Sequence, residues 1–269
     1  MEKHFILTEE FKINSDGIKL FRIQCTKAIP GVMKGKKGGF IEKEENLSGN
    51  AWVSDNAEVY GNGWVFGNAW VFDNAKIYGN SKIYGNAMVS EDAKVFGEAG
   101  VFENARVLGN AKVLDNAEVY GNAEVSDNAE ISGNARVSED ARVFNEAEVY
   151  GNAKVFGKAR VFRNAWVFRN AWVFGEAGVF GNVLVFENAR VFGNAKIYGN
   201  SKIYGNAKIS GSAYINGNIE INDKAEILHN RDFCCFQSFG SRGRTTSVFK
   251  EKENKIKIVT GCFKGNIKE

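Results

Sequence analysis

The sequence predicts an all-β fold: a single-stranded, left-handed parallel β-helix with a triangular cross-section and a non-repeating cap at each end. Three observations predict it. Val or Ile recurs at every sixth position from Val53 to Ile227, which gives thirty hexads without an insertion or deletion. Most hexads place Ala two residues before this aliphatic residue, and most place Gly, Asp or Glu and then Asn after the residue that follows it. Self-similarity at a short fixed period is typical of a solenoid.

Residues 1–50 do not repeat and are predicted to form an N-terminal cap. Residues 21–25 alternate as a strand does, 34–39 indicate a flexible basic turn, and 40–42 lead into the first coil. A cap is expected because the first coil of a solenoid presents unpaired N–H and C=O groups. Trp52, Trp64 and Trp70 follow closely, and we expect them to pack against this cap.

Residues 51–230 are predicted to form the β-helix. Strand geometry directs Ala and Val inward, and the residue between them and the following aromatic residue outward. The next two residues form a corner, as Asp73 and Asn74 illustrate. Asn fills 22 of the 30 fourth positions, which we attribute to its tolerance of left-handed backbone. A bend after every short strand predicts three hexads per coil, hence about ten coils of 18 residues.

Stacking of residues 18 apart predicts columns of like side chains. Outward aromatic residues gather on every face between about residues 144 and 204, whereas the middle of the repeat carries Ser and Glu. Residues 231–269 lie beyond the last hexad, with a predicted linker at 231–244 and a hairpin from 245–250 and 256–260. This segment is either a C-terminal cap or a small appended module.

Charge and cysteine content indicate which kinds of partner and which cellular location to expect. Residues 51–230 contain 17 basic and 21 acidic residues, so we do not expect this part to bind nucleic acid, which needs a basic stripe. The four cysteines show no CxxC spacing, and no apolar run has the length of a signal peptide or a membrane span. We therefore expect a cytoplasmic protein without membrane attachment.

The repeat resembles the hexapeptide-repeat proteins that form left-handed parallel β-helices. The entry segment at 38–42 and 45–53 is similar to the start of YdcK-like transferases, and the tail from Gly240 to Gly265 is similar to the end of hexapeptide-repeat proteins common in bacteria and their phages. The common hexad has Gly directly after the aliphatic residue, whereas an aromatic residue stands there in this chain. The resemblance implies a rigid helix, with an acyltransferase activity in many relatives.

The residues do not favour such an enzyme. His4 and His229 are the two histidines, and both lie outside the uninterrupted coils, so no coil face offers a histidine as general base. Thirty hexads without an insertion leave no loop to wall a pocket. We expect no metal site and no cofactor. An acyl-CoA-dependent transferase or its inactive relative stays an alternative, and a filament-forming scaffold is a second one.

The leading hypothesis is a non-enzymatic β-helix that binds a protein partner or associates with itself as a dimer or trimer. As an extension of this hypothesis, the chain would be a phage or prophage protein that acts on a host factor. The candidate surface consists of basic and large apolar residues: Arg160, Arg163, Trp166, Phe168, Arg169, Trp172, Leu184 and Phe186. The alternative for these residues is a ladder of aromatic side chains that stabilises neighbouring coils. A second candidate is an anion-binding nest with Arg242, Arg244 and Thr245.

Overall fold

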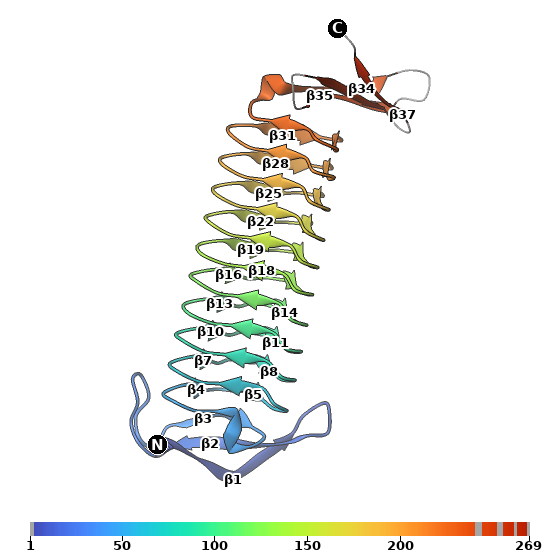
Figure 1. Ribbon diagram of the computed structural model, residues 1–269. Coiled ribbons are helices and arrows are strands. Elements are labelled where there is room, and N and C mark those ends of the chain that lie inside the picture. The colour runs from blue at the N-terminus through green and yellow to red at the C-terminus, as the bar shows by residue number, and fades with distance from the viewer. Residues whose placement is uncertain (1–2, 240–243, 252–254, 261–262, 268–269) are drawn as a thin grey trace. The chain divides into compact units, whose positions relative to one another are not determined.

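The computed structural model describes residues 3–239, 244–251, 255–260 and 263–267 of the chain. The chain divides into two compact units, Met1–Asn134 and Ala135–Glu269, and the same coil repeats within each (Figure 1). Each coil has three short strands, and strands 18 residues apart pair in parallel, as Trp70 with Met88 and Trp172 with Arg190. The predicted all-β solenoid of about ten 18-residue coils is confirmed.

The first unit contains three stacks of parallel strands, each named here after one member. The β8 stack comprises β5 (Glu58–Val59), β8 (Lys76–Ile77), β11 (Lys94–Val95), β14 (Lys112–Val113) and β17 (Glu130–Ile131). The β10 stack comprises β4 (Trp52–Val53), β7 (Trp70–Val71), β10 (Met88–Val89), β13 (Arg106–Val107) and β16 (Glu124–Val125). The β12 stack comprises β6 (Trp64–Val65), β9 (Lys82–Ile83), β12 (Gly100–Val101) and β15 (Glu118–Val119).

The second unit repeats this arrangement with three further stacks. The β22 stack comprises β19 (Arg142–Phe144), β22 (Arg160–Phe162), β25 (Gly178–Phe180), β28 (Lys196–Gly199) and β31 (Tyr214–Gly217). The β23 stack comprises β20 (Glu148–Val149), β23 (Trp166–Val167), β26 (Leu184–Val185), β29 (Lys202–Ile203) and β32 (Glu220–Ile221). The β24 stack comprises β18 (Arg136–Val137), β21 (Lys154–Val155), β24 (Trp172–Val173), β27 (Arg190–Val191), β30 (Lys208–Ile209) and β33 (Glu226–Ile227).

Aliphatic side chains fill the centre of every coil, as the hexad predicts. Ala117 and Val119 in the first unit and Ala171 and Val173 in the second have no exposed surface. Burying a Val side chain contributes about 2 kcal/mol. The repeated Ala–x–Val pattern therefore stabilises each coil and leaves the residue between Ala and Val, here called the outward position, as the variable one.

The corner residues correct one interpretation of the sequence. Every third-position residue of the hexads from Asp55 to Asp223 has a positive φ, between 55° and 107°. The fourth-position Asn residues do not, so their predicted role in the left-handed backbone was wrong. Their side-chain amides form ladders instead: Asn86 Nδ2 donates to Asn104 Oδ1 at 3.0 Å, 18 residues on. Asn suits this position because one amide can donate and accept in the same column.

Residues of the N-terminal segment form an antiparallel meander of β1 (Phe5–Ile13), β2 (Lys19–Cys25) and β3 (Lys37–Ile41), followed by the 3₁₀ turn η1 (Glu44–Asn46). β3 pairs in parallel with β5, so the meander continues the β8 stack. The predicted strand at 21–25 lies within β2. The predicted turn at 34–39 is wrong in its second half, because Gly38 belongs to β3, where a Cβ would lie 2.5 Å from the Val53 carbonyl oxygen.

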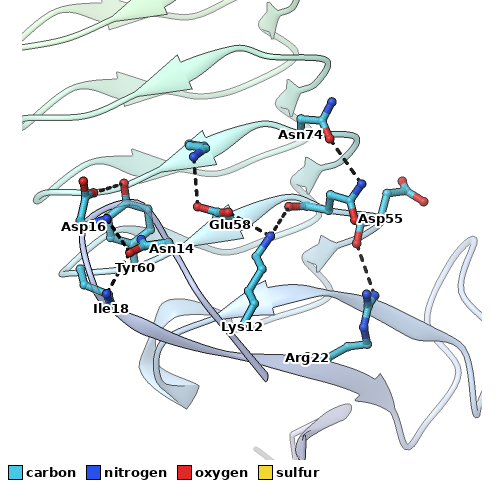
Figure 2. A network of polar contacts seen from close by, with 11 residues as sticks. Lys12, Asn14, Asp16, Ile18, Arg22, Asp55, Glu58, Tyr60 and Asn74 are labelled. Carbon is cyan, nitrogen blue, oxygen red and sulfur yellow. Dashed lines mark hydrogen bonds and ion pairs between the residues drawn. The ribbon is translucent and has the colours of Figure 1, made fainter. Parts of the chain in front are cut away.

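Polar contacts join the meander to the first coils (Figure 2). Lys12 Nζ lies 2.9 Å from Glu58 Oε1, and the Tyr60 hydroxyl donates to Asp16 Oδ2 at 2.9 Å. The three tryptophans contact residues 1–50 as predicted. Trp52 is buried with its ring 6.1 Å from the His4 ring, Trp64 Nε1 donates to Ser48 Oγ at 2.9 Å, and the Trp70 ring lies against Gly31.

The C-terminal segment begins with the 3₁₀ turn η2 (Asn230–Asp232). An antiparallel sheet follows, in the order β34 (Phe233–Phe239), β35 (Arg244–Lys250), β36 (Ile256–Thr260) and β37 (Phe263–Ile267). The hairpin predicted at 245–250 and 256–260 is confirmed as β35 and β36. The predicted linker at 231–244 is wrong for β34, because Cys234 pairs with Val248 and extends the sheet. Ser247 Oγ accepts the Glu220 N–H at 3.3 Å, so β35 contacts the last coil.

Candidate partner-binding surface

The outward positions of the β22 stack carry a column of basic side chains. Arg142 lies directly opposite Arg160 in the neighbouring strand, and Gly178 and Lys196 follow in the next two. The three basic side chains are exposed. Neighbouring strands lie about 4.8 Å apart, and like charges directly opposite each other destabilise a sheet. The column therefore places positive charge together at a cost in stability.

No acidic side chain of the described residues forms an ion pair with this column, and the same holds for Arg163 at the adjoining corner. Four other basic residues in the coils of the second unit have a carboxylate partner 18 residues on. These pairs are Lys158–Glu176 at 3.9 Å, Arg169–Glu187 at 3.0 Å, Lys202–Glu220 at 3.5 Å and Lys208–Glu226 at 3.5 Å. Arg142, Arg160, Arg163 and Lys196 are called here the basic surface.

Arg163 also has an unfavourable backbone. Its φ is +61°, in the left-handed region where most coils use Gly. Several acidic residues at this corner position compensate by accepting an N–H from the next coil, as Glu187 Oε2 does from Gly205 at 2.9 Å. A guanidinium has no acceptor and cannot form this bond. Arg163 thus occupies a strained position without the compensation that its acidic counterparts have.

Aromatic side chains flank the basic column in a continuous ladder. Phe144, Phe162, Phe180 and Tyr198 are stacked with ring centroids 4.7–5.1 Å apart and ring planes within 8° of parallel. A hydrogen bond with Tyr214 raises the pKa of the Tyr198 hydroxyl to about 12. Since each inner ring has a neighbour on both faces, this ladder presents ring edges to solvent. This column therefore fits the alternative prediction, in which a ladder of aromatic side chains stabilises neighbouring coils.

The structure brings four of the predicted site residues together around the β23 stack. Trp166 lies directly opposite Leu184, and Phe168 stacks on Phe186 at 5.0 Å. Trp166 is 39% exposed, and its ring meets Tyr150 edge to face at 6.4 Å. Burial and the nearby Glu148 carboxylate raise the pKa of Tyr150, which keeps its hydroxyl neutral. Trp166 is therefore the accessible aromatic residue of the predicted set.

Two predicted site residues already have partners within the coils. Arg169 pairs with Glu187, and its guanidinium lies 5.9 Å from the Phe186 ring. The Trp172 ring has Lys154 Nζ at 5.0 Å and the Arg190 guanidinium at 4.6 Å. Arg160 and Arg163 lie on the β22 stack and its corner, away from Trp172 on the β24 stack. The predicted set thus falls on three different faces.

The predicted anion-binding nest cannot be placed as a site. Arg242 lies outside the described residues, and Arg244 and Thr245 are described as backbone of β35 only. The two histidines lie at the ends of the coils. His4 is buried, its Nε2 lies 3.0 Å from the Ala51 carbonyl oxygen, and burial lowers its pKa. His229 is exposed, with Nδ1 3.3 Å from Ser212 Oγ.

Sequence reasoning missed Arg142 and Lys196. The signal was present, because both stand 18 or 36 residues from Arg160 in the outward column of one face. Reading the 18-residue columns for charge as well as for aromatic residues finds them. Among the residues that the structure describes, no group of His, Cys, Asp or Glu could hold a metal ion, and no helix is long and apolar enough to cross a membrane.

Comparisons with known proteins do not identify a family or an activity for this chain. No family model matches the chain, and no curated protein matches it. Among solved structures, the chain is similar to a proposed acetyltransferase from Bacillus cereus, with 11% identity over 67% of this chain and 77% of that one, at a TM-score of 0.29. A similarity this weak carries no argument about activity. The resemblance to YdcK-like and phage hexapeptide-repeat proteins stays a prediction.

Proposed function

We propose that this chain is a non-enzymatic β-helical scaffold that binds an acidic protein partner through the basic surface of its second unit. The observation that carries the proposal is the direct register of Arg142 and Arg160 without a carboxylate partner among the described residues. An anion that binds between two such charges removes their mutual repulsion, so these charges favour an acidic partner. Arg163 supports the same conclusion, since an Arg stands at a corner where Gly would relieve backbone strain.

The exposed Trp166 on the adjoining face adds an apolar contact to this surface. Arg163 lies at the corner between Phe162 and the strand that carries Trp166, so charge and aromatic surface are neighbours along the chain. Arg and Trp are the residues that most often carry binding energy in protein interfaces. A partner with carboxylates beside an apolar pocket would complement both parts.

A protein partner fits better than single-stranded nucleic acid. Proteins that bind single strands stack bases on exposed aromatic faces, at about 1–3 kcal/mol per base. In the Phe162 ladder the inner ring faces are occupied by other rings at 4.7–5.1 Å. The basic surface has four cations, which neutralise few phosphates. A carboxylate-bearing protein surface needs neither a stacking face nor a long basic stripe.

Fluorescence anisotropy with labelled poly-L-glutamate tests the proposal. The variant Arg142→Gln/Arg160→Gln should lose about tenfold or more in affinity. The matched control Lys202→Gln/Lys208→Gln removes the same charge from the same unit at residues that are already paired, and should lose much less. Equal losses in both variants would mean binding by net charge alone and would overturn the proposal. Tighter binding of oligo-dT than of poly-L-glutamate would contradict the choice of a protein partner.

A further inference from the structure

Two hexads have glycine at the outward position of the strand, Gly100 and Gly178. Both lie within the same eight residues, Val-Phe-Gly-Glu-Ala-Gly-Val-Phe, which occur at 95–102 and again at 173–180. Neither glycine has a positive φ, and a Cβ on Gly100 would meet nothing closer than the Phe102 ring at 3.6 Å. The backbone therefore does not require glycine at these positions. What glycine provides is the absence of a side chain.

Around Gly100 this absence opens a groove of about 590 Å³ in the first unit. Gly100 lies between Lys82 and Glu118 in the β12 stack, each directly opposite its neighbour. The corner residues Asn80, Glu98 and Asn116 line one side and the stacked rings of Tyr84 and Phe102, 4.8 Å apart, line the other. The groove is thus a notch one side chain deep with mostly polar walls.

Two opposite charges in this groove have no ion-pair partner among the described residues. Lys82 and Glu98 are both exposed, and neither pairs with the other although both line the groove. Elsewhere in the first unit, outward charges of opposite sign on neighbouring strands pair, as Arg106 with Glu124 at 3.7 Å and Lys112 with Glu130 at 3.5 Å. A cation and an anion kept apart across a groove complement a ligand that carries both charges.

Glu98 also interrupts an amide ladder. Asn62 Nδ2 donates to Asn80 Oδ1 at 3.0 Å, and Asn116 Nδ2 donates to Asn134 Oδ1 at 3.2 Å. Glu98 stands between Asn80 and Asn116, where Asn would continue the column. A carboxylate replaces the amide next to the one outward glycine of this unit, so two departures from the repeat meet at one place.

We propose that the groove around Gly100 binds a small zwitterion, an amino acid or a short ω-amino acid. Its carboxylate would lie at Lys82 and its ammonium group at Glu98. The alkyl part would lie over Gly100 and along the edges of Tyr84 and Phe102. This site lies in the first unit and is independent of the basic surface.

The second copy of the octapeptide provides an internal control. There the corner carboxylate Glu176 pairs with Lys158 at 3.9 Å, and Gly178 lies between Arg160 and Lys196. The same notch is therefore bounded by cations on both neighbouring strands, and its corner carboxylate lies beside a lysine. A zwitterion should bind at Gly100 and not at Gly178, although the eight residues are identical.

The test is ligand-detected NMR titration of the full chain with 4-aminobutyrate, with butyrate and butylamine as probes that carry one charge each. Wild type should bind 4-aminobutyrate about tenfold more tightly than either single-charge probe, the ratio expected when one hydrogen bond to a charged group is lost. Absence of binding, or equal binding of butylamine, would overturn the proposal.

Filling the notch locates the site. Gly100→Leu should abolish binding, since Leu184 shows that the outward position accepts this side chain. The matched variant Gly178→Leu should bind as wild type does. Lys82→Met and Glu98→Gln should each weaken the binding of 4-aminobutyrate about tenfold. Lys82→Met should reduce the preference for 4-aminobutyrate over butylamine, and Glu98→Gln should reduce the preference over butyrate. Equal effects of Gly100→Leu and Gly178→Leu would contradict the assignment, and circular dichroism of each variant checks the fold.

Discussion

Replacing Glu58 by Ala should weaken the attachment of the N-terminal meander to the first coils. Glu58 is 7% exposed, with Oε1 2.9 Å from Lys12 Nζ on β1 and Oε2 3.5 Å from Lys76 Nζ on β8 (Figure 2). Oε2 makes no hydrogen bond, so its contact with Lys76 is an ion pair alone. The substitution leaves two lysines facing each other with no carboxylate between them.

The magnitude follows from the burial of the three groups. Removing one partner of a buried ion pair costs about 3–5 kcal/mol, because the other charge is left uncompensated. The Lys12 and Lys76 side chains are 30% and 31% exposed and can turn toward water, which lowers the cost. We expect about 2 kcal/mol, which corresponds to roughly a thirtyfold change in a local opening equilibrium.

Hydrogen exchange measures this opening where β3 joins the coils. The Phe40 and Glu42 amides donate to the Ala57 and Val59 carbonyl oxygens at 2.8 and 3.0 Å, so their exchange should accelerate about thirtyfold in Glu58→Ala. The control Glu124→Ala removes an exposed pair with Arg106 and should change its local amides less than about threefold. Equal acceleration in both variants would show that the Glu58 ion pairs do not hold the meander to the coils.

Three further predictions concern other parts of the chain. Arg163→Gly should stabilise the second unit by about 1 kcal/mol by relieving its left-handed backbone, while weakening poly-L-glutamate binding; a lower melting temperature would contradict it. Burial lowers the pKa of His4 below its ordinary 6.5, so the first unit should lose stability as pH falls below about 6.5, and His4→Gln should flatten that dependence in urea titrations at pH 7 and 5. Trp166→Glu should abolish any concentration-dependent sedimentation with little change in melting temperature, since Trp166 is 39% exposed; unchanged self-association would exclude this residue from the interface.

The coil was predictable because one side chain at a fixed period determines it. Val119 and Ala117 show the pattern: each inward residue meets its own kind 18 residues away, so one hexad describes all of them. The meander at residues 5–41 has no such repetition. Its β1 strand pairs antiparallel with β2 in a register that does not repeat elsewhere in the chain. The contact of Glu58 with Lys12 joins residues more than 40 positions apart, which no local pattern indicates.

The candidate surface was predictable in part for the same reason. The 18-residue period predicts the aromatic columns, and it therefore predicts the stacking of Phe168 on Phe186. Whether a basic side chain has a carboxylate partner depends on the residue 18 positions away, both in the outward columns and at the corners. Arg169 and Arg163 look alike in the sequence, yet only Arg169 has a Glu directly above it, at position 187.

The most direct test of the basic surface is an NMR titration that observes the arginine Nε–Hε signals while poly-L-glutamate is added. We predict that the signals of Arg142, Arg160 and Arg163 shift first and together, because these guanidinium groups have no carboxylate partner among the described residues. The signal of Arg169, held by Glu187 at 3.0 Å, should shift last. Shifts spread evenly over all arginines, or led by Arg169, would show that the basic surface is not the binding site.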